Sequence, residues 1–464
     1  MNWTAVQGSF RDPSGFLYRR NGVLYRQVNA GFREQFEALN SSGLYAELTA
    51  DSLLIRHRQV DPALRATPEA HAVLEPEIVK FISYPYEWCF GQLKDAALLT
   101  LELQLRALKR NMVLRDASAF NVQFRDGSPI FIDTLSFEQY VEGEPWGAYK
   151  QFCEHFLAPL AIMSGRDIRL GQTFRDFIDG IPLDFASHLL PTRSWFRTGL
   201  LLHLHLHARA QRKYADAKVS AVARGRKLSR LQLTRLIDSL RSAVDDLSWR
   251  AAGTEWADYV HNHNYSPRAV ESKQGIVAQF LSRTKAALAW DMGANTGIFS
   301  RIARRTASCV VAMDMDPAAV QLNYEQVKAQ HETGILPLIM DARNPAPALG
   351  WDHRERMSLA ERGPADVVLA LALVHHLAIG NNVPLNLVAG WLARLARVLI
   401  IEFVPKNDSQ TARLLANRPD VFPHYTQEGF EQAFAHLFEL EDARRVEDSE
   451  RVIYRMRAKP ERQN

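Results

Sequence analysis

The 464-residue sequence is poor in cysteine, contains no long apolar run and carries little net charge. Its three cysteines, Cys89, Cys153 and Cys309, lie far apart without a Cys-x-x-Cys pair. That spacing excludes a disulfide framework and a thiolate zinc site. The longest apolar run, near Val367–Val374, is too short to cross a bilayer, and the first residues lack the pattern of a signal peptide. We therefore expect a cytoplasmic protein with no membrane partner.

The charge balance argues against a nucleic-acid partner. Lys plus Arg number 56 and Asp plus Glu number 52, a net charge of +4. Residues 209–241 hold ten basic and two acidic residues, so this segment carries +8 and the remainder −4. The segment also has almost no aromatic side chains on which bases could stack. We interpret it as an exposed, basic, helical connector.

The length predicts two or three domains, and no internal repeat divides the chain. The residue pattern changes at about 245. Residues 1–245 are predicted to form a helix-rich α+β domain, which includes a hairpin at 16–28 around Asn21-Gly22 and a long helix at 91–110.

Residues 246–464 alternate short apolar runs with helical stretches. The five runs are ALAWDMG, CVVAMDMD, GILPLIMD, ADVVLALALV and ARVLIIEF, and two further runs near the C-terminus predict an antiparallel hairpin. Runs without polar alternation indicate strands that are covered on both faces, as in a parallel sheet. We predict a doubly wound, mostly parallel, seven-stranded Rossmann-like α/β sheet whose parallel strands are separated by helices.

A glycine-containing loop, Asp291–Gly297, directly follows the first of these strands. Glycines allow the backbone to approach a ligand, and the start of the next helix adds N–H donors. Asp314 ends the second strand, where a carboxylate can accept both ribose hydroxyls, and Asp341 ends the third, where it can accept from an adenine amine. The loop is not Gly-x-Gly-x-x-Gly, so the pattern favours a nucleoside with a non-phosphate tail.

On these motifs, residues 285–460 resemble the class I S-adenosylmethionine-dependent methyltransferases. The loop fits that family's Asp/Glu-x-Gly-x-Gly/Asn-x-Gly pattern, and the two strand-end acids stand at the family's positions. The resemblance implies S-adenosylmethionine as the cofactor and methyl transfer as the reaction. It implies contacts of Gly293, Asn295 and Gly297 with the methionine and ribose parts, of Asp314 with the ribose, and of Asp341 with Ala342 around the adenine. The full cofactor set that we predict is Lys273, Tyr265, Asp291, Gly293, Asn295, Gly297, Asp314, Met315, Asp341 and Ala342.

Two members of that set precede the first strand. Tyr265 belongs to an aromatic segment that commonly forms the lid in this family. Lys273 could bind the carboxylate of the cofactor, or it could be a plain surface lysine. A decayed cofactor site on the same fold is the alternative to a working one.

The candidate catalytic residues follow the fourth and fifth strands. Methyl transfer is an in-line displacement, so the protein must position an acceptor and, for a hydroxyl or amine, remove a proton. His375 and His376 end the fourth strand, and a histidine can act as a base at neutral pH. We favour His376 as the group that faces the ligand and His375 as the packing partner, with Glu402 as a second acceptor-side group. Alternatively, both histidines only shape the loop and Glu402 forms a surface ion pair.

The N-terminal half contains a second set of polar residues. Asp116 and Asn121 are five residues apart, and Asp133 follows twelve residues later at the end of a short strand. This is the spacing of the protein-kinase catalytic loop and metal-binding acid, and the N-terminal half resembles a degenerate kinase-like fold. Asn121 and Asp133 are the weak metal candidates that this resemblance implies. The alternative is that Asp116 and Asn121 cap a hairpin loop.

The kinase pattern is damaged at several positions. Leu114 replaces the usual histidine, and Arg26 stands where the phosphate-pairing lysine should be, with Glu34 or Glu37 as its expected helix partner.

We therefore predict a methyltransferase whose N-terminal domain aids recognition of the acceptor or a partner. A bifunctional or nucleotide-binding kinase-like protein and a non-catalytic cofactor-binding scaffold are the two alternatives.

The whole-chain pattern also resembles bacterial methyltransferases with nodulation or secondary-metabolite functions. This second resemblance names no acceptor, although a small molecule is favoured. The methylated atom and the oligomeric state stay open.

Overall fold

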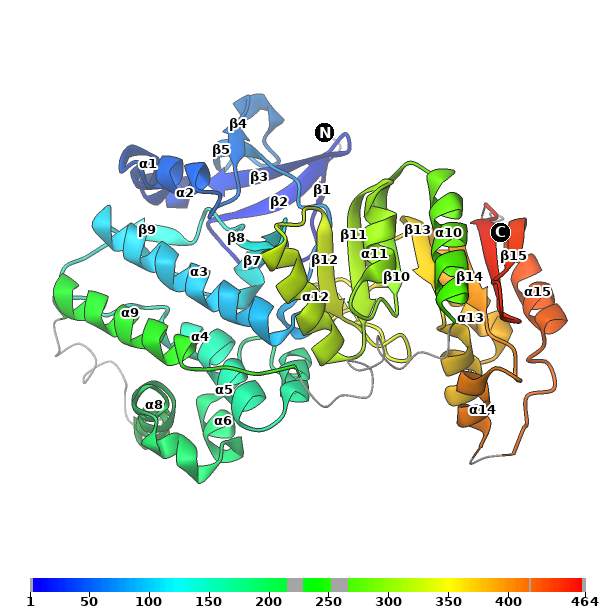
Figure 1. Cartoon of the computed structure of the whole chain (residues 1–464). Helices are drawn as coiled ribbons and strands as arrows, with labels where there is room; N and C mark the ends of the chain where they lie inside the picture. Colours follow the sequence, from blue (N-terminus) through cyan, green and yellow to red (C-terminus); the bar gives the residue numbers. More distant parts are fainter. Residues whose placement is uncertain (1–2, 215–227, 252–265, 417–418, 461–464) are drawn as a thin grey trace. The chain divides into compact units, whose positions relative to one another are not determined.

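A computed structural model describes residues 3–214, 228–251, 266–416 and 419–460. The chain forms two compact units (Figure 1). Unit 1 contains Met1–Arg250 and Leu349–Arg356, and unit 2 contains Ala251–Ala348 and Met357–Asn464. Within the described residues, no helix combines the length and apolarity needed to cross a membrane.

Unit 1 begins with a five-stranded antiparallel sheet in the order β1-β2-β3-β5-β4. The predicted hairpin joins β2 to β3, with φ of 51° at Asn21 and 80° at Gly22. Positive φ at both central residues is what a type I′ turn requires, so the hairpin prediction is confirmed. The elements are β1 (Trp3–Ala5), β2 (Gly15–Arg20), β3 (Val23–Asn29), α1 (Arg33–Ser41), α2 (Leu44–Ala50), β4 (His57–Gln59) and β5 (Ala70–Pro76).

A long helix leads into two small strand pairs. Helix α3 (Phe90–Lys109) occupies the range predicted for it, and it buries one face along most of its length. Strand β6 then pairs with β9, and β7 pairs with β8 in a hairpin. These strands are β6 (Met112–Leu114), β7 (Val122–Arg125), β8 (Ser128–Phe131) and β9 (Phe137–Gln139).

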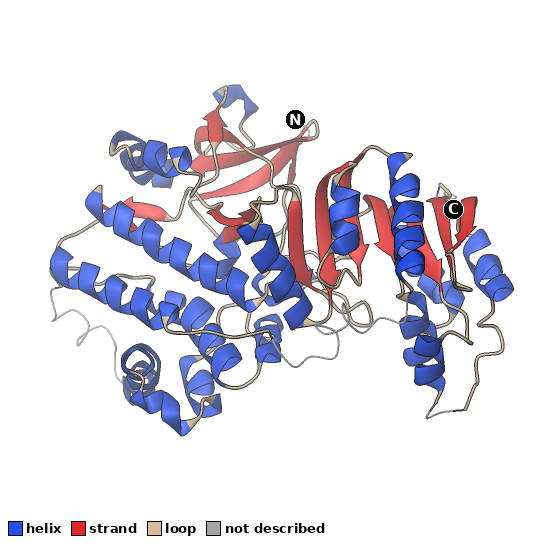
Figure 2. Ribbon diagram, in the orientation of Figure 1, coloured by secondary structure: helices blue, strands red, loops and turns tan. Residues whose placement is uncertain are grey.

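The rest of unit 1 is helical, as predicted (Figure 2). Its helices are α4 (Tyr149–Phe152), α5 (Ala158–Gly165), α6 (Leu183–Leu189), α7 (Thr198–Leu200), α8 (His207–Tyr214) and α9 (Arg230–Asp245), with π-helical turns at Cys153–Leu157 and Leu201–Leu206.

The expected exposed connector at 209–241 is wrong for its second half. Helix α9 packs against α3 and buries an apolar stripe that includes Leu233, Ile237 and Leu240. Arg241 lies beside this stripe and pairs with Glu102 of α3 at 3.2 Å. The prediction relied on the basic residues and overlooked the apolar residues, which recur every three to four positions as in an amphipathic helix. Residues 215–227 of the segment lie outside the described part of the chain.

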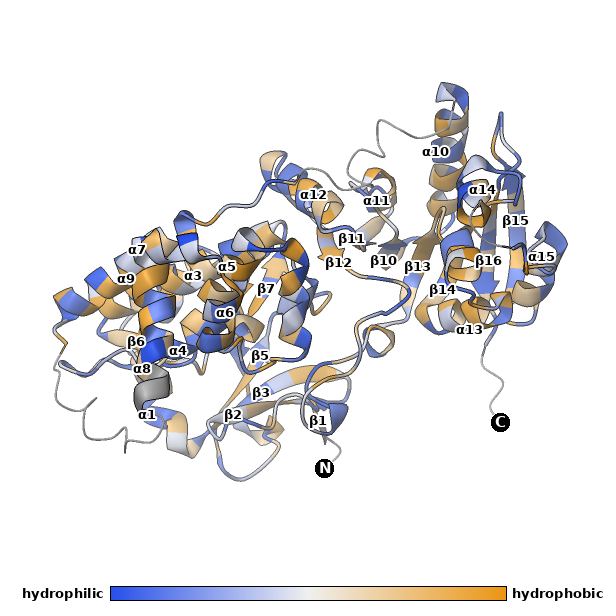
Figure 3. Cartoon of the chain, turned by 90° about the horizontal axis from the view of Figure 1, so that it is seen from below, coloured by the Kyte–Doolittle hydropathy of each residue, from blue (hydrophilic) through white to orange (hydrophobic). Residues whose placement is uncertain are grey.

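Unit 2 contains the predicted seven-stranded sheet, in the order β12-β11-β10-β13-β14-β16-β15. The first five strands are parallel, and the final hairpin is antiparallel to β14. The strands are β10 (Ala286–Met292), β11 (Ala307–Asp314), β12 (Ile335–Ile339), β13 (Ala365–Ala370), β14 (Ala396–Phe403), β15 (Phe438–Arg445) and β16 (Val452–Ala458). Figure 3 shows apolar residues along β12 and a hydrophilic β15, and charge on such an edge strand discourages pairing with other chains.

Helices connect most of these strands, but the predicted helix between β12 and β13 is absent. Residues 340–364, all described, contain only the short 3₁₀ turns at Trp351–His353 and Ala360–Arg362. Pro345, Pro347 and Pro364 disfavour a helix there. The helices present are α10 (Pro267–Ser282), α11 (Ile298–Arg304), α12 (Pro317–Ala329), α13 (Leu385–Leu395), α14 (Ser409–Leu415) and α15 (Gln427–Ala435).

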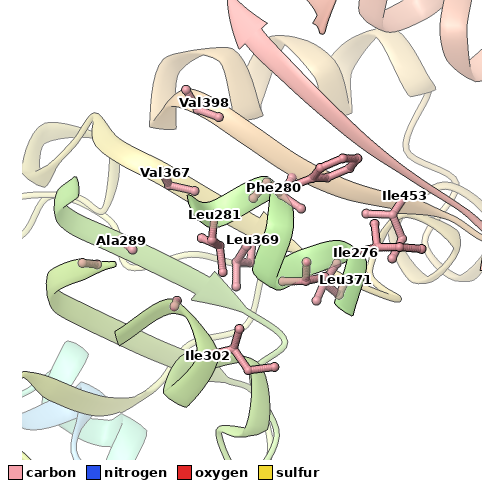
Figure 4. Close-up of a cluster of buried hydrophobic side chains, with 14 of the residues drawn as sticks. Ile276, Phe280, Leu281, Ala289, Ile302, Val367, Leu369, Leu371, Val398 and Ile453 are labelled. Atoms are coloured by element: carbon pink, nitrogen blue, oxygen red, sulfur yellow. The ribbon is translucent and has the colours of Figure 1, made fainter. Parts of the chain in front are cut away.

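A hydrophobic cluster fixes α10 on the sheet (Figure 4). Ile276, Phe280 and Leu281 of α10 pack with residues of β10, β13, β14 and β16. Burial of each such side chain contributes roughly 1.5–3 kcal/mol. This packing sets the position of Lys273, which lies one turn before Ile276 on the same helix.

Candidate functional site

The loop after β10 has the backbone that its glycines and asparagine allow. The φ angles are 80° at Gly293, 50° at Asn295 and 86° at Gly297, a region that glycine and asparagine adopt most readily. A Cβ at Gly297 would lie 2.5 Å from Arg301 Nη1 and 2.6 Å from Asn323 Nδ2. A Cβ at Gly293 would meet only Leu371 O, at 3.9 Å. A side chain at Gly297 would therefore displace the ends of these two side chains as well as strain φ, whereas at Gly293 a Cβ would make only an ordinary contact.

Hydrogen bonds join this loop to the end of β11. The N–H of Gly293 donates to Met313 O at 2.8 Å, and the N–H of Asn295 donates to Asp314 Oδ2 at 2.8 Å. The second oxygen of Asp314 accepts from the N–H of Asp316 at 2.9 Å. Burial raises the pKa of the Asp314 carboxyl to about 6. Two carboxylate oxygens offer about four acceptor positions, so Asp314 retains capacity for hydroxyl donors.

Asp291 lies beneath the loop. Its side chain is 2% exposed and accepts from Ser300 Oγ at 2.6 Å. Burial raises the pKa of the Asp291 carboxyl to about 6. This contact holds the start of α11 against β10, and the predicted contact of Asp291 with the cofactor stays a prediction.

Asp314 and Asp341 follow adjacent parallel strands and so share one sheet edge with the loop, as predicted. Asp341 is paired with Arg343, whose Nη2 lies 2.8 Å from Oδ2, and Ala342 beside it is half-buried.

Two apolar side chains at this edge, Met315 and Ile298, are each 44% exposed. Sequence reasoning missed Ile298, although its position directly after the last loop glycine could have indicated it.

Arg301 supports the loop and was also missed. Its Nη1 donates to Thr296 O at 2.8 Å, to Gly297 O at 3.1 Å and to Asn323 Oδ1 at 3.0 Å. The other side of the guanidinium pairs with Glu332 at 2.7 Å. In the sequence it is one of two arginines on a short helix, so no local pattern distinguishes it.

Glu402 and Lys273 form a buried ion pair. Lys273 Nζ lies 2.7 Å from Glu402 Oε2, with the two side chains 7% and 0% exposed. The N–H of Ala372 also donates to Glu402 Oε2, at 2.8 Å, and Arg451 Nη1 lies 3.7 Å from Oε1. Burial lowers the pKa of Lys273, while Glu402 counteracts that shift. The pair is buried, so the alternatives of a surface lysine and a surface ion pair are wrong. The predicted contacts of Lys273 with the cofactor carboxylate and of Glu402 with the acceptor stay predictions.

The two histidines after β13 differ in environment. His375 is 1% exposed, and among the described residues its Nδ1 has no hydrogen-bond partner. Burial, with a contribution from His376, holds the pKa of His375 well below its usual value. His376 is half-buried, and its ring centroid lies 4.2 Å from that of His375. Of the pair, His376 is the one that solvent can reach.

An open pocket lies at the N-terminal ends of α13 and α15. Its volume is about 530 Å³, and its described lining residues include no Asp, Glu, Lys or Arg. One wall, around Phe422, is held by Lys406, whose Nζ donates to Asp420 Oδ2 and to Phe422 O at 2.7 Å each. The lining residues are Ala378, Asn382, Val383, Pro384, Leu385, Asn386, Val421, Phe422, Pro423, His424, Tyr425, Gly429 and Ala433. Sequence reasoning missed this pocket because two distant segments form it.

The predicted lid residue Tyr265 lies outside the described residues, within 252–265.

In unit 1, Arg26 makes a different contact from the one predicted. Its guanidinium pairs with Asp133. Within the described residues it forms no ion pair or hydrogen bond with Glu34 or Glu37, its expected partners, and Glu37 pairs with Arg33 at 2.8 Å. The charge of the Asp133 carboxylate is thus balanced by the guanidinium of Arg26.

The other two polar residues of that set make local contacts. Asp116 Oδ1 accepts from the N–H of Ser118 at 2.9 Å and from Gln151 Nε2 at 2.8 Å. Burial, with a contribution from Asp133, raises the pKa of Asp116. The Nδ2 of Asn121 lies 3.4 Å from Ser136 Oγ. Across the described residues, no group of three or more His, Cys, Asp or Glu side chains is arranged to hold a metal ion.

The sheet order and the acids at its carboxyl edge define a Rossmann-like α/β fold of the class I methyltransferase type. The chain belongs to the family of the nodulation protein NoeA of Rhizobium meliloti (strain 1021). It is 36% identical to that protein over 455 residues, which cover 97% of this chain and 95% of NoeA.

Solved structures give weaker matches. The N-methyltransferase NodS from Bradyrhizobium japonicum WM9 is 9% identical, covers 42% of this chain and 98% of NodS, and has a TM-score of 0.31. Magnesium protoporphyrin IX methyltransferase (ChlM) from Synechocystis PCC 6803, with bound SAH, is 16% identical, covers 45% of this chain and 91% of ChlM, and has a TM-score of 0.30. At these TM-scores the fold assignment rests on the strand order itself. No protein-family model matches the chain.

Proposed function

We propose that this protein is an S-adenosylmethionine-dependent methyltransferase. The observation that carries the proposal is the bond between the Asn295 N–H and the Asp314 carboxylate at the carboxyl edge of a seven-stranded sheet. It places a glycine-containing turn next to an acid that can accept ribose hydroxyls. The cofactor is S-adenosylmethionine, with Met315 and Ile298 as apolar contacts and Asp341 on the adenine side. The sulfonium supplies the methyl group when the cofactor is bound.

The acceptor enters the pocket near α13 and α15. Ala378, which lines it, belongs to the turn that starts at His376. A lining without charged side chains suits an uncharged, partly apolar small molecule or moiety. His376 then receives the proton that an acceptor hydroxyl or amine releases. Kinship with a nodulation protein supports placing this reaction among nodulation functions.

Calorimetric titration with S-adenosylmethionine, S-adenosylhomocysteine and ATP tests the proposal. The wild-type protein should bind both adenosyl ligands, and Asp314→Ala should lose at least tenfold in affinity for them, about 1.4 kcal/mol. Glu439→Ala, an exposed acid of β15, is the matched control and should bind as wild type does. Equal binding by Asp314→Ala and wild type would show that the cofactor assignment is wrong.

For unit 1 we propose a kinase-like scaffold that recognises the acceptor or a partner and does not transfer phosphate. The support is its order of elements: a five-stranded antiparallel sheet with helices between β3 and β4, a long helix, and then the β6–β9 and β7–β8 pairs. Arg26 pairs with Asp133, which stands at the position of the acid that would hold a metal in a kinase. Magnesium-dependent ATP binding that Asp133→Ala abolishes would support the bifunctional alternative instead.

A further inference from the structure

The chain between β12 and β13 leaves unit 2 and returns to it. Residues Leu349–Arg356, which we call the strap, belong to unit 1. The strap closes on itself, because Leu349 and Arg356 exchange backbone hydrogen bonds of 3.0 and 3.1 Å. The N–H of Trp351 donates to Glu355 Oε1 at 2.7 Å. It is thus a short ordered turn rather than a featureless loop.

Charge and close packing hold the strap in unit 1. The Arg11 guanidinium donates to both oxygens of Glu355, at 2.7 and 2.6 Å, and the Glu355 side chain is 2% exposed. A two-point pair of this kind fixes geometry as well as contributing attraction. Gly8 lies so close that a Cβ there would be 2.6 Å from Glu355 O.

Aromatic contacts hold the two ends of the strap. The ring of Trp351 lies 5.9 Å from that of Phe10, edge to face. The Arg356 guanidinium lies over the ring of Phe120, at 4.0 Å from its centroid. Phe120 belongs to the same loop as Asp116 and Asn121. One end of the strap therefore contacts the loop in which the kinase-like pattern had suggested a ligand site.

The strap is close in sequence to the candidate cofactor site. Leu349 follows Asp341 by eight residues, and Arg356 precedes Ala365, the start of β13, by nine. Residues 342–348 and 357–364 contain no α-helix or strand. A connection of this length without a fixed point would have many conformations, and each ordered residue costs roughly 1–2 kcal/mol of conformational entropy. Docking in unit 1 supplies the fixed point.

We propose that docking of the strap in unit 1 is thermodynamically coupled to cofactor binding in unit 2, with Arg11 and Glu355 as positioning residues. This inference rests on the proposed cofactor. Docking restricts the connection that begins at Asp341, so a ligand that orders the same connection meets a smaller entropic cost. Coupling of this kind is reciprocal, because the ligand must then stabilise docking by the same factor by which docking strengthens ligand binding.

The test measures S-adenosylhomocysteine affinity by calorimetry and amide hydrogen exchange of the strap in the full-length protein. Glu355→Gln and Arg11→Gln should each speed exchange at the Glu355 and Arg356 amides and weaken the ligand at least about fivefold. The double variant should bind no more weakly than the poorer single variant, because both changes remove one contact. The control is Glu75→Gln, which removes an exposed ion pair with Arg58 in unit 1 and should change neither quantity.

The reciprocal measurement needs no variant. Saturating S-adenosylhomocysteine should slow exchange of the strap amides in the wild-type protein, which also keeps the inference testable if a variant fails to fold. Faster strap exchange in Glu355→Gln with unchanged ligand affinity, or no ligand effect on strap exchange in wild type, would overturn the coupling and leave the cofactor proposal intact. A wild-type protein that binds no adenosyl ligand would overturn both.

Discussion

The N–H of Asn295 donates to the Asp314 carboxylate at 2.8 Å, so the glycine-containing loop after β10 and the acid after β11 form one hydrogen-bonded unit. Because these contacts exist within the protein itself, a ligand at this edge meets an arrangement that is already ordered. Preorganisation lowers the entropic cost of binding. The same carboxylate is buried with a pKa of about 6, and that makes its ionisation state a usable probe of the site.

The first prediction concerns pH. If ribose hydroxyls donate to Asp314, the ionised carboxylate binds them more strongly, and S-adenosylhomocysteine affinity should rise as the pH increases through about 6. At pH 5 about a tenth of a group with this pKa is ionised, so the affinity should fall roughly tenfold between pH 7.5 and pH 5. Calorimetric titrations across this range provide the measurement. Asp314→Asn should remove most of the pH dependence.

A second buried acid supplies the control for that experiment. Asp291 also has a pKa raised to about 6 by burial, but its carboxylate binds Ser300 inside the protein. Asp291→Asn should therefore keep the pH dependence of ligand affinity. If the pH dependence disappears in Asp291→Asn and persists in Asp314→Asn, Asp291 causes it and the prediction for Asp314 is wrong.

The pH dependence of stability has the opposite sign. Both acids have folded-state pKa values above their ordinary value of 3.8. Such a group contributes stability that is fully present below the unfolded pKa and is lost as pH rises through the folded value. As the pH rises from about 4 to about 6, the free energy of unfolding should therefore decrease because of these two groups. Urea unfolding of wild type and of Asp291→Asn over this interval should show a smaller decline in the variant.

The two loop glycines should respond differently to alanine. At both positions φ is about 80°, which costs an alanine roughly 1 kcal/mol. Gly297→Ala also forces the Cβ against Arg301 and Asn323, so it should destabilise the protein by about 2–4 kcal/mol, whereas Gly293→Ala should cost only about 1 kcal/mol. Gly275→Ala on α10, where a Cβ meets nothing within 4 Å, should be neutral or stabilising. Equal destabilisation by the two loop variants would contradict this packing argument.

The sequence predicted features that depend on local pattern. The hairpin at Asn21-Gly22 follows from two residues that tolerate positive φ, and the seven-stranded sheet follows from apolar runs such as that of β13. The candidate cofactor edge was predictable because parallel strands bring their carboxyl ends together, which places Asp314 beside the loop.

Features that depend on contacts between distant residues were not predictable. The strap is held by Arg11, which lies 344 positions from Glu355, and no local pattern in either segment indicates the other. Helix α9 was misread because the ten basic residues of 209–241 outweighed its apolar period in our interpretation of that segment. Glu402 offered a signal that could have been used: an acid within the apolar run VLIIEFV is buried, and a buried acid needs a partner.

The Lys273–Glu402 pair leads to a prediction about stability. Lys273→Met removes the nearest counter-charge of the buried Glu402, although Arg451 stays at 3.7 Å. It should destabilise unit 2 by up to roughly 3–5 kcal/mol, and Glu402→Gln should do so by a similar amount. The double variant should be more stable than the sum of the single effects implies, because it removes both charges. Chemical denaturation of the four proteins gives the coupling energy. Additive effects would show that the pair contributes little.

The last prediction separates the two histidines. His376 is half-buried and reachable, so His376→Asn should lower methyl transfer to an acceptor hydroxyl or amine by about 10²–10⁴-fold while leaving the unfolding midpoint nearly unchanged. His375 is 1% exposed with a pKa well below its usual range, so it is neutral and packs in the interior. His375→Asn should mainly lower stability, with turnover reduced in proportion to the folded fraction. Single-turnover assays at matched folded fractions distinguish the two effects. If His376→Asn keeps full turnover with an acceptor whose proton must leave, His376 is not the base.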